Sequence, residues 1–200
     1  MSSDSAPGQG RDTADGTGIT RTFGWQDMFV APEEDPRTDG GLAGERATLI
    51  DYLRNYRLTL ELKCSGLDAA GLACRSVPPS NLSLLGLVRH MAEVEYNWFR
   101  RVLAGQDTGW RFQTDDDPDA AFTGAVADPQ LVDAAWAAWR EEVRFAEQFV
   151  EDAPDLEVTG TYTGGVVSLR EVLVHMIEEY ARHMGHADLL RERIDGRVGQ

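Results

Sequence analysis

SLREVLVHMIEEYARHMGHADLLRERIDG, residues 168–196, has the pattern of one long amphipathic helix. Ser168 with Glu171 three residues later predicts a capping box at its start, and Gly196 is typical of a helix end. Between them one stripe recurs at steps of three and four residues: Leu169, Val172, Met176, Glu179, His183, His186 and Leu190. The periodicity therefore places a carboxylate and two imidazoles at positions that face a helical core.

Three further segments share this periodicity and complete the predicted fold. They span residues 42–63, 82–104 and 128 to about 150, and Asp128-Pro129 suits the N-cap and first turn of the last one. Four amphipathic helices bury their stripes most simply in an all-α four-helix bundle. The long link between the second and third helices, residues 105–127, is either a crossover connection or a functional lid. TGTYTGGVV, residues 159–167, forms either a short hairpin or a loop.

The chain divides by composition into three parts. Residues 1–21 are rich in Gly, Ser, Asp and Thr and are predicted to be a disordered tail. Residues 22–40 carry an aromatic cluster and are predicted to be an arm that docks onto the domain or onto a partner. Residues 41–200 contain the bundle.

The charge of the chain argues against several classes of partner. It has 34 acidic and 19 basic residues, a formal net charge of -15 that would repel a nucleic-acid backbone or an anionic membrane. No apolar run approaches the roughly 20 residues of a membrane-spanning helix. Two cysteines, Cys64 and Cys74, are too few for a secreted disulfide framework, and the N-terminus does not resemble a signal peptide. We therefore expect a cytoplasmic protein that binds neither nucleic acid nor membranes.

Two other clusters have less specific interpretations. The acidic residues of the 105–127 link lack the spacing of a calcium-binding loop, which favours a solvated surface. Four tryptophans could serve a homodimer interface or the core of the bundle: Trp98, Trp110, Trp136 and Trp139. Oligomeric state is left open by the sequence.

The polar residues of the 168–196 stripe indicate a metal site. Glu179 and His183 are four residues apart, so they project from one face of the helix. A buried carboxylate must be paired, protonated, hydrated or bound to a cation. His90 lies beside the apolar stripe of the second helix and would add a third ligand, leaving an open position as in catalytic zinc sites. The alternative is a hydrogen-bonded core histidine, with Glu179 paired to Arg89, Arg182 or another cation.

The segments SLLGLVRHMAEVEYNWF (83–99) and 168–196 together resemble the DinB superfamily, in particular its actinobacterial subgroup with the ending RHxGHADLLRExIDG. The resemblance covers residues 42–200. It implies a four-helix bundle, often dimeric, with a divalent metal held by His90, Glu179 and His183. Many relatives have histidine at the first position of the pair on the fourth helix. This sequence has Glu179 there, and so resembles the mycothiol-dependent maleylpyruvate isomerases. Zinc is expected, with nickel, iron or manganese as alternatives.

Five residues near the proposed ligands are candidates to support them or to bind substrate: His175, His186, Glu93, Arg89 and Arg182. His175 would be a fourth ligand, a partner of a ligand, or a residue on the flank of the bundle. Glu93 would either orient His90 as a hydrogen-bond acceptor or lie on a solvated face. The two arginines would offer donors to an anionic cofactor, unless they are surface residues.

The resemblance implies a metal-dependent thiol S-transferase that joins mycothiol, or a related low-molecular-weight thiol, to a small electrophile. The isomerases carry a further C-terminal domain that this sequence lacks, so general S-transfer is expected rather than maleylpyruvate isomerisation. Neither cysteine belongs to a nucleophile motif, and no catalytic residue is assigned. One alternative is a metal-dependent hydrolase or lyase that activates water. Another is a non-catalytic stress protein that binds a metal for stability or sensing.

Overall fold

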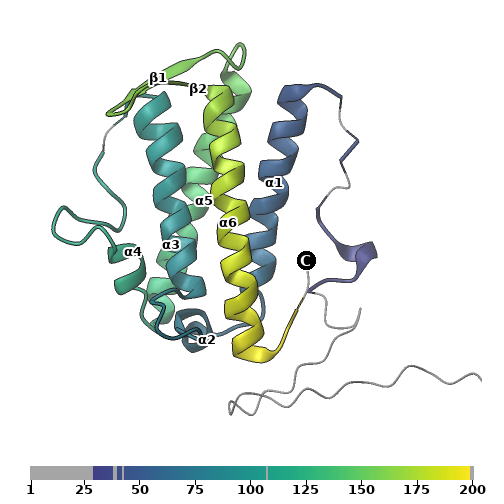
Figure 1. The fold of residues 1–200 in the computed structure, drawn as a ribbon, viewed down its shortest axis with the longest axis vertical. Coiled ribbons are helices and arrows are strands. Elements are labelled where there is room, and N and C mark those ends of the chain that lie inside the picture. The colour runs from purple at the N-terminus through teal and green to yellow at the C-terminus, as the bar shows by residue number, and fades with distance from the viewer. Residues whose placement is uncertain (1–28, 38–39, 42, 107, 199–200) are drawn as a thin grey trace, which may run out of the picture.

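Four long helices lie side by side in the computed structural model, which describes residues 29–37, 40–41, 43–106 and 108–198 (Figure 1). They are α1 (Glu45–Cys64), α3 (Leu84–Glu95), α5 (Pro129–Asp152) and α6 (Leu169–Asp195). A π-helix, η3 (Tyr96–Leu103), continues α3. The short elements are η2 (Pro32–Glu34), α2 (Ala69–Ala73), α4 (Ala120–Thr123), β1 (Thr159–Tyr162) and β2 (Gly165–Ser168). The predicted all-α fold is confirmed.

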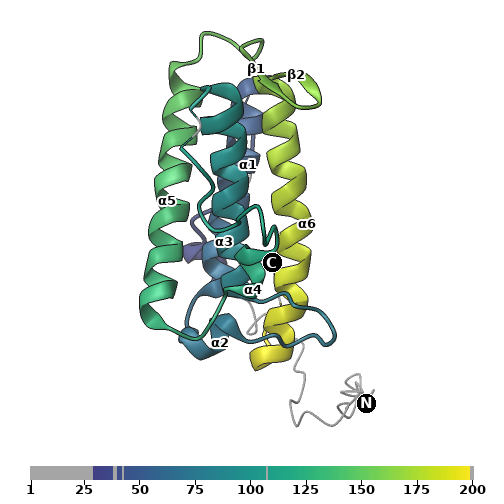
Figure 2. The same ribbon diagram turned by 90° about the vertical axis from the view of Figure 1, so that its left-hand side faces the viewer.

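The link between α3 and α5 is a crossover. Both helices begin at the end of the bundle where α2 lies, so they run parallel, whereas α1 and α6 run the opposite way (Figures 1 and 2). The chain from residue 104 to 128 returns along the bundle from one end to the other and contains α4. Of the two expectations for this segment, the structure therefore shows the crossover connection.

The helix ends follow the signals in the sequence. Ser168 and Glu171 form the complete capping box, and Gly196 ends α6 with a φ of 79°. The Asp128 side chain accepts a hydrogen bond from the Gln130 N–H at the start of α5. The second predicted helix differs from expectation in its last two turns, where α-helix gives way to π-helix. There the N–H of Ala104 donates to the carbonyl of Phe99, five residues earlier.

A buried polar network crosses the otherwise apolar core. Arg57 of α1 donates two hydrogen bonds to Glu95 of α3, at 2.8 and 2.7 Å. The Tyr180 hydroxyl of α6 donates to Glu95 at 2.8 Å and accepts from the Trp139 indole of α5 at 2.8 Å. Each of the four long helices contributes one residue, and all four residues are buried. The network therefore ties the bundle together across its centre.

The segment 159–168 forms a hairpin rather than a loop. Its two strands pair antiparallel, with Gly160 opposite Val167. A Cβ atom at Gly160 would lie 2.3 Å from the carbonyl oxygen of Val102. The hairpin can therefore sit directly on the end of η3 because this position has no side chain.

The predicted arm is described only from Phe29 onwards, and the predicted tail at residues 1–21 lies outside the described residues. The Phe29 ring contacts three cations, with Lys63 Nζ at 4.4 Å, Arg191 Cζ at 5.1 Å and Arg197 Cζ at 5.6 Å from its centroid. This part of the arm therefore packs on the bundle. None of the helices in the described ranges combines the length and apolar character needed to cross a membrane.

Candidate metal centre

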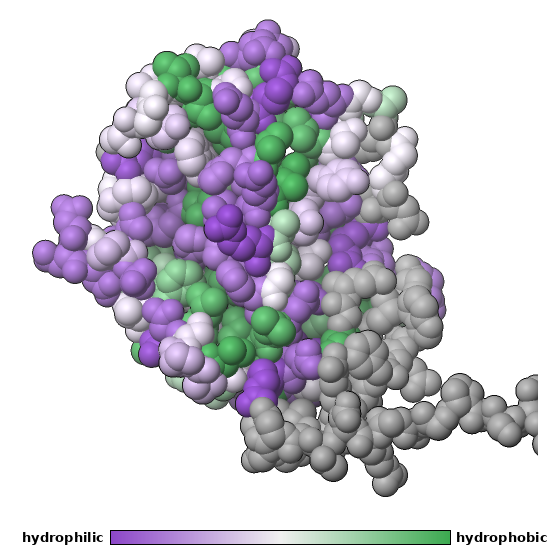
Figure 3. Space-filling view, in the orientation of Figure 1, coloured by the Kyte–Doolittle hydropathy of each residue, from purple (hydrophilic) through white to green (hydrophobic). Residues whose placement is uncertain are grey.

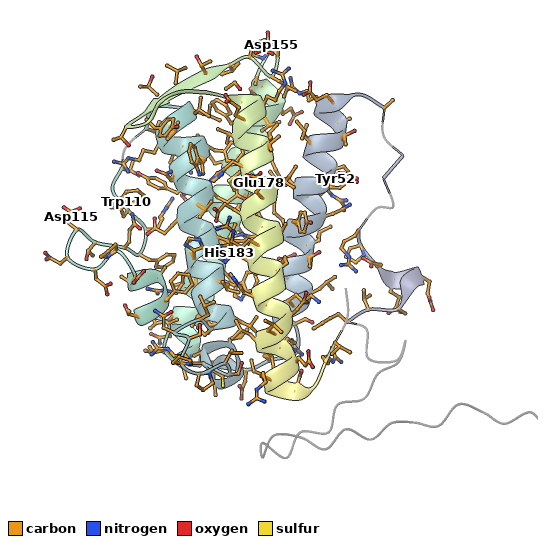
Figure 4. The ribbon with its side chains drawn as sticks, viewed as in Figure 1. Tyr52, Trp110, Asp115, Asp155, Glu178 and His183 are labelled. Atoms are coloured by element: carbon orange, nitrogen blue, oxygen red, sulfur yellow. The ribbon has the colours of Figure 1, made fainter. Side chains whose placement is uncertain are left out.

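Three predicted side chains meet in the seam between α3 and α6. His90 comes from α3, and Glu179 and His183 lie one turn apart on α6. One potential ligand atom from each residue lies within 4.8 Å of the other two. His183 lies at mid-height of the bundle, where the two helices face one another (Figure 4). The structure therefore brings together the set that spacing and resemblance had singled out.

Glu179 is the centre of this cluster. Its Oε2 atom lies 3.3 Å from Nε2 of His183 and 3.8 Å from Nε2 of His90. The imidazole rings of His90 and His183 are 4.6 Å apart between centroids. The three side chains are 20, 11 and 28 % exposed for Glu179, His183 and His90. The cluster is therefore mostly enclosed, with part of each side chain reaching solvent.

Burial keeps both imidazoles neutral. Desolvation lowers the pKa of His90, against the opposing effect of Glu179. Desolvation, followed by repulsion from His90, lowers the pKa of His183 to about 4. At neutral pH each ring therefore has a nitrogen lone pair available. Two neutral imidazoles and a carboxylate are the donor set of a divalent transition metal, so these residues fit such an ion.

His186 lies behind His183, away from Glu179. The two Nδ1 atoms are 3.3 Å apart. If Nε2 of His183 ligates a metal ion, its Nδ1 would carry the proton and would donate to Nδ1 of His186. A partner of this kind holds a ligating imidazole in one tautomer and one orientation.

His175 lies one turn before Glu179, on the open side of the seam. Its Nε2 is 3.9 Å from Oε1 of Glu179, and its side chain is 39 % exposed. The ring packs edge-to-face against Trp98, with centroids 4.8 Å apart. His175 therefore borders the cluster from the solvent side. Its place combines two of the expectations, because it lies next to a proposed ligand and also on the flank of the bundle.

Glu93 requires a correction. It is 5 % exposed, so it does not lie on a solvated face. Its carboxylate accepts hydrogen bonds from three successive backbone N–H groups in the crossover, those of Arg111, Phe112 and Gln113. Glu93 thus anchors the crossover to α3 instead of acting as the hydrogen-bond acceptor of His90. Sequence spacing could not show this, because the partners are backbone groups of a distant segment.

The two arginines also differ from the expectation of ligand-binding donors. Arg89 donates at 2.8 Å to the carbonyls of Ala121 and Ala120, so its guanidinium holds α4. Arg182 lies on the exposed face of α6. The ionic contacts of Glu179 in the described part of the chain are with histidines, which argues against pairing with either arginine.

Three aromatic residues near the cluster were missed as site residues. Phe122 of α4 packs on the His90 ring, with centroids 5.2 Å apart. Trp98 of η3, which the sequence placed in the core or at an interface, contacts both His175 and Tyr162 of the hairpin. These residues come from separate elements, so no local pattern connects them.

Fold and cluster together define an all-helical bundle with a His–Glu–His set able to hold a metal ion. A family model for mycothiol S-transferases matches residues 48–196, and the chain belongs to this DinB-like family. One matching solved structure is described as the conserved protein of locus from Enterococcus faecalis. It is 16 % identical, covers 78 % of this chain and 99 % of its own, and has a TM-score of 0.53, which shows a shared fold. A search of curated proteins found no match.

Proposed function

We propose that this protein is a metal-dependent S-transferase that joins the sulfur of mycothiol to a small electrophile. The observation that carries the proposal is the convergence of His90, Glu179 and His183 within 4.8 Å, in a chain of the mycothiol S-transferase family. We propose zinc as the metal. Two nitrogen donors and one oxygen donor also suit nickel, iron and manganese, among which geometry and supply select.

A divalent cation held here supplies Lewis acidity, which lowers the pKa of a thiol and stabilises its thiolate. The residues of the chain prepare the site for that chemistry. His90 and His183 present neutral nitrogen donors, and Glu179 offsets part of the positive charge. With Nε2 of His183 on the metal, its Nδ1–H would donate to Nδ1 of His186, which would hold the ring in that orientation.

The thiol proton must leave before sulfur forms a bond to an electrophilic carbon. We infer that His175 accepts this proton and passes it to water, a role supported by the 3.9 Å between its Nε2 and Glu179 and by the exposure of its side chain. Phe122 packs against His90 from the α4 side, and we propose that it limits the access of water there. S-transfer needs this exclusion because water would compete for the electrophile.

The first experiment measures metal content in untagged protein. We expect about one metal ion per chain in the wild type, loss of the metal in His183→Ala, and retention in the matched control His175→Ala. Cobalt-substituted wild type is then titrated with mycothiol, and we expect a sulfur-to-cobalt absorption band. Metal without this band would contradict S-transfer and favour the hydrolase or lyase alternative. Absence of metal from the wild type would refute the site.

A homodimer remains a prediction of the proposed function. Trp139 is buried and bonded within the bundle, whereas Trp110 is 37 % exposed and offers apolar surface to a partner. Sedimentation equilibrium of the purified protein tests the prediction, and a monomer at micromolar concentration would contradict it.

A further inference from the structure

We propose that Trp98, His175 and Tyr162 form a recognition shelf for an uncharged sugar ring of the thiol substrate. The choice of this substrate part rests on the proposed function. Mycothiol is N-acetylcysteine linked through glucosamine to inositol, so most of the molecule is an uncharged array of hydroxylated rings. The shelf would bind that array while the sulfur lies at the metal centre.

The shelf continues directly from the cluster along the α3–α6 seam. His175 is 3.9 Å from Glu179, Trp98 packs on His175 at 4.8 Å, and Tyr162 packs on Trp98 at 5.7 Å between ring centroids. The rise of α6 between Glu179 and His175 is about 6 Å. A ring joined by a short linker to a sulfur at the cluster therefore reaches the shelf.

Two of the three rings of the shelf are well exposed, and Trp98 is half-buried. The side chain of His175 is 39 % exposed, and Tyr162 is 41 % exposed. Exposed aromatic rings beside convergent polar groups are typical of small-molecule sites. The faces of these rings can pack against the C–H faces of a sugar ring. The carboxylates of Glu178 and Glu179 lie beside His175 and can accept hydrogen bonds from the sugar hydroxyl groups.

Glycine leaves room for Tyr162 on the hairpin. A Cβ atom at Gly164 would lie 2.4 Å from Cε2 of Tyr162, so a side chain there would push the ring away from its present place. The hairpin itself is seated on η3 through Gly160. The packing of the Tyr162 ring on Trp98 limits where that ring can lie, so it loses less conformational freedom when a ligand binds.

The charge around the shelf selects against anionic ligands. Glu178 lies 4.0 Å from Nδ1 of His175 and is 69 % exposed, and Glu179 lies on its other side. In the parts of the chain that the structure describes, the cation–ring contacts involve other aromatic residues and none involves Trp98 or Tyr162. The surface over the middle of α6 is hydrophilic, between more hydrophobic areas nearer its ends (Figure 3). Carboxylates accept hydrogen bonds from hydroxyl groups, so this surface fits a polyol.

The test uses the full-length metal-loaded protein and a mycothiol analogue in which alanine replaces the cysteine. Titration calorimetry measures its dissociation constant for the wild type, Tyr162→Ala and the ring-retaining control Tyr162→Phe. We expect binding to the wild type, about tenfold weaker binding to Tyr162→Ala, and a change of about twofold or less in Tyr162→Phe. N-acetylcysteine, which lacks the sugar, should bind the cobalt form of all three proteins equally. Circular dichroism and metal content confirm that the variants fold.

Each outcome separates this inference from the proposed function. Failure of the analogue to bind the wild type, or equal binding to Tyr162→Ala, would overturn the shelf even if mycothiol produced the cobalt absorption band. Binding of the analogue that depends on the ring of Tyr162 would support the shelf even if that band were absent. Ring-dependent binding of the analogue without the cobalt absorption band would refute S-transfer while leaving the sugar site in place.

Discussion

Replacing Glu95 by glutamine tests the stabilising role of the network that crosses the bundle. The carboxylate is fully buried and accepts three hydrogen bonds of 2.7 to 2.8 Å, two of them from Arg57. Glutamine keeps nearly the same shape, so packing is little affected. It removes the negative charge and places an amide N–H donor against the guanidinium.

The expected magnitude follows from the burial of Arg57, which is 6 % exposed. After the change its remaining carboxylate contact is Glu147, at 3.6 Å and 54 % exposed. Removing one partner of a buried pair costs about 3 to 5 kcal/mol. An amide oxygen at the Oε1 position still accepts hydrogen bonds from Arg57 Nε and from the Tyr180 hydroxyl, so we expect the lower end of this range, about 3 kcal/mol. With a urea slope of about 2 kcal/mol/M, the unfolding midpoint should fall by about 1.5 M.

Urea unfolding monitored by tryptophan fluorescence, with a chelator present to remove any metal contribution, measures this shift. Glu61→Gln is the matched control because it breaks an exposed pair with Arg140 at 3.4 Å. We expect it to cost less than about 1 kcal/mol. Adding Arg57→Met to Glu95→Gln removes the uncompensated charge and should recover much of the loss. A midpoint shift for Glu95→Gln no larger than that of the control would refute the reasoning.

Three further predictions concern the crossover, the hairpin and the cluster. Glu93→Gln should speed hydrogen exchange at the three amides it binds by about tenfold without changing metal content, and unchanged exchange would contradict the anchoring role. Gly160→Ala should lower the free energy of unfolding by about 1 to 3 kcal/mol through overlap with Val102, whereas Gly185→Ala, which meets no atom within 4 Å, should not destabilise. In metal-free protein the unfolded chain protonates His183 near pH 6.5 but the folded chain only near pH 4, so its contribution to stability is lost as pH falls between these values. Denaturation at several pH values measures this effect. Between pH 6.5 and 4 the free energy of unfolding should fall by about 3 kcal/mol less in His183→Gln than in the wild type. If the free energy of unfolding fell equally with pH in both proteins, the lowered pKa would be contradicted.

The features predicted correctly from the sequence are those with a local physical cause. Caps at Ser168 and Asp128 satisfy N–H groups within one turn, so their signatures lie within a few adjacent residues. The meeting of Glu179 and His183 follows from helical spacing alone. The prediction for His90 needed one further assumption, that the apolar stripe of its helix faces the stripe of α6. In the bundle the two stripes do face one another.

The features missed depend on contacts between distant segments. Glu93 and Arg89 bind backbone groups of the crossover, which has no periodicity to reveal its path. The aromatic shelf combines residues from η3, α6 and the hairpin, and their proximity follows only from the way these elements pack. The change from α- to π-helix at Tyr96 left no pattern in the apolar stripe that we could recognise.

That change of helix type has a consequence for how the protein can vary. His90 lies before the wider turns of η3, and Trp98 lies within them. One residue of an α-helix corresponds to a rotation of about 100°, so deleting a single residue from η3 would turn the later part of the helix without moving the earlier part. A deletion between Glu95 and Trp98 would then redirect Trp98 while the histidine keeps its place beside α6. The helix would thus separate the proposed metal ligand from the proposed recognition residue, so that a change of length could alter the second and spare the first.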